Sequence, residues 1–329
     1  MRRETLMKRK LRFERLENRE LLSATTWDVP SESANVAEIA ANSGEDGAVA
    51  ASPIVVDTAR DVVDANDGVT SLREAIAALP DGGTIAFAKS LRDQTLTLES
   101  QIEITQSVMI DASDRFHYNG GARDPNGTGI TIDGQKATRL FEIAVGAELT
   151  AIGVSFVNGE VVGMANHDHG GAFHVRGTLN LYDCLIADSN ATLGGGAVSV
   201  EGTDAAFNAR RVVFEGCGGG EYGGAALGTD GATVSVVDCE FRLNGINYED
   251  GRKTGGGGAV AIRNASFTSL RSTYRDNDAW FGGALFFTDS TVYMAGDLVV
   301  GNGGTSDMSA ATGVGSYNGG GIEIGRAHV

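Results

Sequence analysis

The densest group of side chains able to bind a metal lies between residues 167 and 174. It contains three of the five histidines in the chain, His167, His169 and His174, together with Asp168. Imidazole and carboxylate groups are the ligands that Zn²⁺ and similar ions prefer. His174, however, stands between two apolar residues of a β-type run, which places its ring on the outer side of a strand. We therefore predict a solvated loop without a metal, and His167, Asp168 and His169 are the residues that would hold one.

A second group combines aromatic rings with carboxylates in irregular segments between glycine-rich repeats. Aromatic rings stack on the faces of sugar rings, and carboxylates accept hydrogen bonds from sugar hydroxyls. We therefore predict a binding site for a polysaccharide, a cell-surface glycan or another surface protein. The alternative is that Trp280 and Phe281 only cover the neighbouring repeat. The predicted binding residues are Tyr222, Tyr248, Glu249, Asp250, Asp278, Trp280, Phe281 and Tyr317.

Enzymes that cleave glycosidic bonds use a pair of carboxylates, so paired acidic residues are the candidates for catalysis. Asp276 and Asp278 flank Asn277 and could pair, although a polar turn explains them equally. The chain contains neither the motifs typical of polygalacturonases nor those typical of pectate lyases. We predict no catalytic residue here. The alternative is a polysaccharide lyase or glycosidase whose catalytic residues lie on unmatched loops or beyond Ile322.

The candidate residues are positioned by a repeat that spans residues 170–321. Gly-Gly-Ala occurs five times, starting at residues 170, 195, 223, 257 and 282, and Gly-Gly-Gly starts at residue 319. The second glycines follow one another at spacings of 25, 28, 34, 25 and 37 residues. A constant minimum with variable insertions is typical of a solenoid. The insertions all fall at the same position of the repeat, so we expect them along a single edge of the solenoid. They are residues 159–169, 191–194, 218–222, 245–254, 278–281 and 303–317.

Apolar residues align in columns when the repeats are superimposed. The three columns are Leu179, Phe207, Val234, Phe267 and Val292; Ile186, Phe214, Phe241, Tyr274 and Val299; and Phe173, Val198, Ala226, Val260 and Leu285. Three residues after the second column stands Asn or Cys in four repeats, and after Ile186 the Asn comes one residue late. We place Asn190, Asn244, Asn277 and Asn302 in one stacked corner. Alternation within a repeat and stacking between repeats predict short parallel strands around a filled interior.

Composition and charge limit the function further. The 329 residues include 47 glycines and carry a net charge of −17, and residues 1–24 are basic. An acidic body argues against a nucleic-acid partner. It permits Ca²⁺, but we predict no cofactor. Cys184 and Cys239 fall two repeats apart, about 9.6 Å, which is too far for a disulfide, so all three cysteines are predicted to be buried thiols. No apolar run is long enough for a transmembrane helix.

The N-terminal residues 11–24 read Leu-Arg-Phe-Glu-Arg-Leu-Glu-Asn-Arg-Glu-Leu-Leu-Ser-Ala. This segment resembles the planctomycete-type extracellular sorting motif, and the resemblance implies export to the cell exterior or cell surface. Residues 25–53 are rich in Ala, Ser, Glu and Asn without periodicity, which predicts a disordered linker.

Residues 70–79 predict a helix before the first repeat. Ser71 and Glu74 form a capping box, and Leu72, Ile76 and Leu79 lie on one apolar face. Such a helix would cap the open end of the solenoid. The Ser-Leu-Arg-Glu-Ala-Ile core resembles the CSLREA segment that precedes β-helix repeats in surface proteins, with Thr70 in place of the cysteine. We interpret Arg73 and Glu74 as charges of the helix surface.

Two further resemblances concern residues 55–322. Gly-Gly-Thr-Ile at 82–85 and Ile-Thr-Ile-Asp-Gly at 130–134 resemble the opening coils of pectate-lyase-like β-helices. The Gly-Gly-Ala and Phe-x-x-Asn pairs resemble the repeats of the polymorphic outer-membrane proteins, which are surface adhesins. We therefore predict an all-β, right-handed parallel β-helix over residues 54–322 with a short N-terminal capping helix. Early strands are expected at 84–87, 96–98, 102–104, 108–110, 130–132 and 149–156.

The last seven residues, 323–329, depart from the repeat. They match one reading frame of a common sequencing adapter, so we expect read-through there and a β-helix that is truncated at its C-terminal end. The function expected from these observations is that of an exported cell-surface protein without catalysis, either an adhesin or a carbohydrate-binding stalk. A polysaccharide-degrading enzyme and a purely structural spacer are the alternatives.

Overall fold

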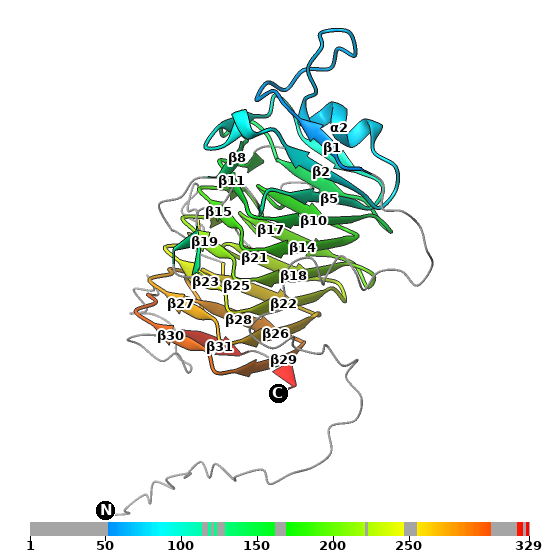
Figure 1. Cartoon of the computed structure of the whole chain (residues 1–329). Coiled ribbons are helices and arrows are strands. Elements are labelled where there is room, and N and C mark those ends of the chain that lie inside the picture. The colour runs from blue at the N-terminus through cyan, green and yellow to red at the C-terminus, as the bar shows by residue number, and fades with distance from the viewer. Residues whose placement is uncertain are drawn as a thin grey trace, which may run out of the picture. The chain divides into compact units, whose positions relative to one another are not determined.

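The computed structural model describes residues 52–113, 118–119, 122–123, 129–161, 169–220, 223–246, 255–303, 321–324 and 327–328. Residues 51–329 form one compact unit. In this unit the chain is an all-β parallel β-helix of about eight turns, as predicted (Figure 1). Each turn contributes one strand to each of three sheets, which we name sheets A, B and C.

All three sheets are parallel throughout. Sheet A consists of β1 (Ile54–Val56), β2 (Gly83–Phe87), β5 (Val108–Asp111), β10 (Glu148–Ile152), β14 (Thr178–Tyr182), β18 (Ala206–Arg210), β22 (Thr233–Val237), β26 (Ser266–Leu270), β29 (Ser290–Ala295) and β32 (Ala327–His328). Sheet B consists of β3 (Thr95–Thr97), β8 (Ile130–Asp133), β11 (Val154–Val157), β15 (Leu185–Ala187), β19 (Val213–Glu215), β23 (Glu240–Arg242), β27 (Thr273–Arg275) and β30 (Leu298–Val300). Sheet C consists of β4 (Ile102–Ile104), β9 (Phe141–Ile143), β13 (Phe173–Val175), β17 (Val198–Glu201), β21 (Ala226–Thr229), β25 (Val260–Arg263), β28 (Leu285–Thr288) and β31 (Ile322–Ile324).

Smaller elements complete the chain. A fourth sheet, which we name the corner sheet, was not predicted and contains β12 (Glu160–Val161), β16 (Asn190–Ala191), β20 (Gly218–Gly219) and β24 (Gly245–Ile246). Outside the solenoid strands are the α-helix α2 (Leu72–Ala78), the 3₁₀ helix η1 (Lys89–Leu91) and the antiparallel pair β6 (Tyr118–Asn119) and β7 (Ala122–Arg123).

The strand register confirms the three predicted apolar columns. Phe207 lies opposite Leu179 and Val234 in sheet A, and the other two columns align in the same way in sheets B and C. The column residues from β13 to β28 are almost fully buried. Aromatic rings add to this interior, because Phe214 and Phe241 stack at 4.2 Å between ring centroids. The solenoid therefore has a continuous apolar core.

The corners between sheets depend on residues with positive φ. Gly153 has a φ of 72° and divides β10 from β11. The single strand predicted over residues 149–156 was therefore wrong, because the chain turns a corner within this apolar run. The same corner in the next turns is formed by Asp183 and Arg211, which also have positive φ. Non-glycine residues make these corners at a conformational cost, so glycine content alone does not locate them.

The predicted capping helix is present as α2 at the N-terminal end of the solenoid (Figure 1). Ser71 accepts a hydrogen bond from the Glu74 amide, and Glu74 in turn accepts one from the Ser71 amide, which confirms the capping box. Arg73 is a partly exposed charge of the helix, and the structure adds partners that the sequence did not predict. Its guanidinium pairs with both oxygens of Asp61 and also donates to the carbonyls of Ser100 and Gln101. Arg73 thus fastens the cap to the solenoid.

The C-terminal residues continue the ladder rather than breaking it. Strand β31 pairs with β28, and β32 pairs with β29, each in parallel register. Separately, none of the helices in the described part of the chain is long and apolar enough to cross a membrane.

Candidate functional site

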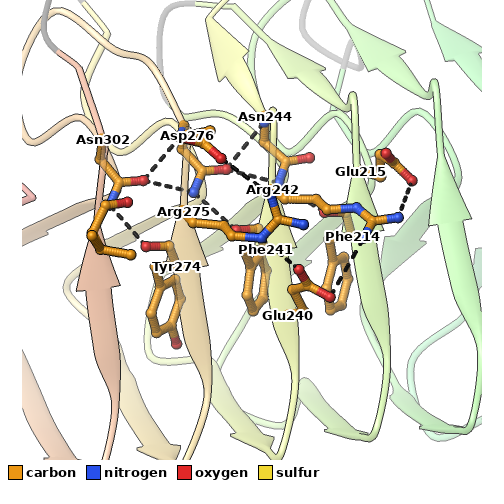
Figure 2. A network of polar contacts seen from close by, with 12 residues as sticks. Phe214, Glu215, Glu240, Phe241, Arg242, Asn244, Tyr274, Arg275, Asp276 and Asn302 are labelled. Atoms are coloured by element: carbon orange, nitrogen blue, oxygen red, sulfur yellow. Dashed lines mark hydrogen bonds and ion pairs between the residues drawn. The ribbon is translucent and has the colours of Figure 1, made fainter.

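A ladder of stacked asparagines supports the corner next to the candidate loops (Figure 2). The Asn277 carboxamide oxygen accepts hydrogen bonds from the backbone and side-chain nitrogens of Asn244, at 3.1 and 3.0 Å. The Asn302 carboxamide oxygen likewise accepts hydrogen bonds from the backbone and side-chain nitrogens of Asn277, both at 2.9 Å. Each side-chain amide group also donates to a backbone carbonyl of the preceding turn. For Asn277 this is the carbonyl of Phe241. All three asparagines are buried, so the ladder is a structural element and not a binding group.

The predicted place of Asn190 in this ladder was wrong. Residues three positions after the aromatic column occupy the ladder, and in the Ile186 turn that position is Ser189, which accepts a hydrogen bond from the Gly159 amide. Cys217 stands in the next turn, and its amide donates to Asn244. Asn190 lies one residue further along, in β16, where it pairs with Gly218. The signal in the sequence was the spacing, because Asn190 is four residues after Ile186 and the ladder asparagines are three residues after their column residues.

Charged side chains cover the outer surface of sheet B beside the ladder (Figure 2). Arg242 contacts Glu215 at 2.8 Å and Glu240 at 3.6 Å. Arg275 contacts Glu240 at 2.7 Å and Asp276 at 3.1 Å. These alternating charges neutralise one another between turns. Two guanidiniums and three carboxylates therefore form a continuous ion-pair network over β19, β23 and β27.

The insertions begin along one edge, as predicted. Their first residues lie side by side in the corner sheet, and isolated bridges extend this alignment from Gly245 to Asp278 and on to Gly303. Further bridges join His169 to Gly194 and Gly256 to Phe281 near the ends of the insertions. We name this alignment the loop edge.

Three of the predicted binding residues lie on the described part of the loop edge. Asp278 is half-buried, and burial raises the pKa of its carboxyl group, while the Ala279 amide acts in the opposite direction. Its neighbours in the same column, Gly245 and Gly303, have no side chains to cover it. Trp280 and Phe281 are half-buried, and their rings make an edge-to-face contact at 6.4 Å between centroids.

The backbone around these residues is held on both sides. The Asp278 amide donates to Asn244, and the Ala279 amide donates to Gly303. Phe281 donates to Gly255 through its amide and accepts from Gly257 through its carbonyl. Short hydrogen-bonded segments like this present side chains with little loss of backbone entropy on binding. The structure thus places an aromatic pair and a carboxylate within four residues of one fixed segment.

Of the other candidates, His169 is described and half-buried, and among the described residues it belongs to no group of three or more His, Cys, Asp or Glu side chains that could hold a metal ion. The rest lie outside the described residues, and their predictions stand untested. They are Tyr222, Tyr248, Glu249, Asp250 and Tyr317 for binding, and His167 and Asp168 for a metal.

The His174 side chain faces outward on β13, as predicted, but it is 6% exposed rather than solvated. It lies 3.4 Å from Glu201 and 4.0 Å from Glu142. Burial lowers the pKa of His174, and Arg139 lowers it further, whereas the two carboxylates raise it. Arg139 is itself buried and donates to the carbonyls of His169 and Gly170. Sequence reasoning missed this cluster because its members come from successive turns about 30 residues apart.

All three cysteines are buried free thiols, as predicted. Burial raises the pKa of Cys217 and of Cys239 to about 12. A thiol with so high a pKa is a poor nucleophile and a poor metal ligand at neutral pH. Within the described residues, no group of three or more His, Cys, Asp or Glu side chains is arranged to hold a metal ion.

Comparison with known proteins gives no family to which these features can be assigned. No protein-family model matches the chain, and no curated protein and no solved structure matches it significantly. The fold and the arrangement of its surface residues are therefore the basis for inferring a function.

Proposed function

We propose that this protein is an exported, noncatalytic surface protein that binds polysaccharide at its loop edge. The observation that carries the proposal is the Trp280–Phe281 ring pair beside the half-buried carboxylate of Asp278. Aromatic surface can contact the apolar face of a sugar, and the carboxylate can accept its hydroxyl hydrogen bonds. The basic N-terminal segment, with its resemblance to a sorting motif, supports export.

The test uses Trp280 as its own reporter. In a Trp27→Phe background, Trp280 is the only tryptophan. Titration with soluble xylan, as a neutral polysaccharide, and with polygalacturonate, as an acidic one, should change its fluorescence in a saturable manner if a glycan covers the ring. Calorimetry should then show affinity about ten-fold weaker for Trp280→Ala. Val145→Ala, which alters an exposed apolar residue away from the loop edge, should leave it unchanged. Affinity retained in Trp280→Ala, or no saturable response to either glycan, would contradict the proposal.

A polysaccharide-cleaving enzyme is the second candidate, and one observation favours it. Asp278 has a raised pKa, whereas Asp276, two residues earlier, is exposed and paired with Arg275. Glycosidases use two carboxylates held in different environments as acid and base or nucleophile. Release of reducing sugar that is abolished by Asp278→Asn and by Asp276→Asn would support the enzyme. Binding without any sugar release would support the noncatalytic protein.

A further inference from the structure

The outer surfaces of the three sheets differ in their chemistry. Sheet B carries the ion-pair network over β19, β23 and β27, and the outward residues in the middle of the sheet C strands β13, β17, β21 and β25 are buried, as shown by Ser199 at 2% and Leu227 at 1% exposure. Sheet A is open over β14, β18, β22, β26 and β29, where the outward positions alternate with buried ones and are half-exposed or exposed. We name the outward side of these five strands the sheet A face.

The sheet A face is almost free of charge. Its outward side chains are Thr, Ser, Asn, Ala, Val, Leu and Tyr, and Arg210 is the one charged residue among them. Charges are instead placed at the corner with sheet B. There Arg211 forms two hydrogen bonds of 2.6 Å with Asp183, and Arg271 forms two of 2.7 and 2.9 Å with Asp238. A protein with a net charge of −17 thus presents a wide uncharged surface bordered by paired charges.

Hydroxyl groups on this face are available to a ligand. Across the part of the chain that the structure describes, none of the six serine and threonine hydroxyls on this face forms a hydrogen bond; they belong to Thr178, Thr233, Ser235, Ser266, Thr268 and Thr291. Thr178, Thr233, Ser266 and Thr291 share one column, which Ala206 of β18 interrupts, and Ser235 and Thr268 are neighbours in the next column. Neighbouring strands in a column are about 4.8 Å apart. Threonine has few χ1 rotamers, so its hydroxyl loses little freedom when it is bound. The face therefore offers a pre-ordered array of donors and acceptors.

We propose that the sheet A face is a second binding surface, which takes a neutral polysaccharide in its extended form. Neutral sugar chains present uncharged hydroxyls, so both partners can exchange water for direct hydrogen bonds without burying a charge. A polyanion would be disfavoured by the net charge of the protein. This surface lies on a different sheet from the loop edge and does not depend on the function proposed for Trp280.

The experiment is a depletion assay of the full chain on insoluble particles. Cellulose and chitin serve as neutral probes, and calcium alginate beads serve as the anionic probe. The chain should be depleted by at least one neutral probe, with equal depletion in about 50 mM and 500 mM NaCl because no charges are paired on binding. Thr233→Lys together with Thr291→Lys should reduce binding about ten-fold or more, because both ammonium groups would lose water without gaining a partner. Thr95→Lys together with Thr273→Lys adds the same charge on sheet B and should have no such effect.

Other variants separate this surface from alternative explanations. Thr233→Val, Thr268→Val and Thr291→Val remove hydroxyls without adding charge, and this triple variant should also bind more weakly while keeping the same circular dichroism and unfolding temperature. In a Trp280→Ala background, which removes the contribution of the loop edge, a neutral probe should still deplete the chain, and Thr233→Lys together with Thr291→Lys should still reduce that depletion about ten-fold or more. Absence of depletion on both neutral probes, depletion confined to alginate, or equal loss in the Thr95 and Thr273 control would overturn the proposal.

Discussion

At the scale of single residues, burial separates side chains that support the fold from those that can bind. Asn277 satisfies donors and acceptors of two neighbouring turns and is fully buried. Asp278 follows it directly in the chain, yet its carboxylate lies in a column of glycines at the loop edge. Adjacent residues at a corner point in different directions, so the Asn277 side chain is buried in the ladder and the Asp278 side chain is half-buried at the loop edge.

Replacing Asp278 by Asn should stabilise the protein at neutral pH. Burial raises the pKa of Asp278, so the folded state binds its proton more tightly than the unfolded state does. The charged carboxylate therefore destabilises the fold at pH values above the raised pKa, and this effect disappears as the pH falls to the unfolded value of about 3.9. Urea unfolding should show Asp278→Asn more stable than the wild type at pH 7, with the difference vanishing near pH 3.

The matched control is Asp276→Asn, which removes an exposed partner of Arg275. Surface pairs contribute at most about 1 kcal/mol, so this variant should be unchanged or slightly less stable at pH 7. A pH-independent difference between wild type and Asp278→Asn would show that the carboxylate is not destabilised by its surroundings.

At the scale of the element, the Gly-Gly-Ala motif has a separate physical reason for each residue. The first glycine has positive φ in all five copies, for example 76° at Gly257. The second glycine lies against the backbone of the next turn, and a Cβ on Gly258 would be 2.3 Å from the Gly283 carbonyl oxygen. The alanine is fully buried, as Ala259 shows. The motif therefore marks the point at which successive turns approach most closely.

Gly258→Ala should be strongly destabilising because the added methyl group would collide with backbone that cannot move independently of the next turn. We expect a loss of roughly 2–4 kcal/mol in the free energy of unfolding, measured by urea denaturation. Gly245→Ala is the matched control, since its Cβ would meet only the Asp278 carbonyl oxygen at 3.3 Å and its φ is not positive. Similar losses for both variants would contradict the close-approach explanation.

At the scale of the whole molecule, stacking gives each sheet its own surface. Sheet B carries an ion-pair network over β19, β23 and β27, the mid-strand outward residues of sheet C are buried from β13 to β25, and the sheet A face is open with Arg210 as its one charged residue. Because each turn contacts its two neighbours, stability should vary along the axis rather than being uniform.

Hydrogen exchange should show this variation directly. Strand β19 is paired on both sides, by β15 and β23, whereas among the described strands β30 is paired only with β27. The outward residues Leu298 and Val300 of β30 are exposed, and Val299 is only half-buried. Amides of β19 should therefore exchange about a hundred-fold or more slowly than those of β30, as measured by mass spectrometry of peptides. Equal protection of the two strands would mean that the solenoid opens only as a single unit.

The capping helix, the three apolar columns and the parallel strand order could be predicted from the sequence because they depend on local periodicity and on a repeated spacing. The loop edge was also predictable, since insertions at one phase of a repeat fall on one side. Asn190 was placed one residue wrongly, and Gly153 was missed, because corners are made by glycines, aspartates and arginines alike.

The sequence by itself determined that this chain is a parallel β-helix and where its turns begin. Only the tertiary structure decided which polar residues are available to a partner. Arg242 becomes part of an ion-pair network, and His174 becomes buried among charges, through contacts with turns 25 to 35 residues away. The uncharged face of sheet A likewise forms only when five strands stack. These properties arise between turns, and a pattern within one turn does not contain them.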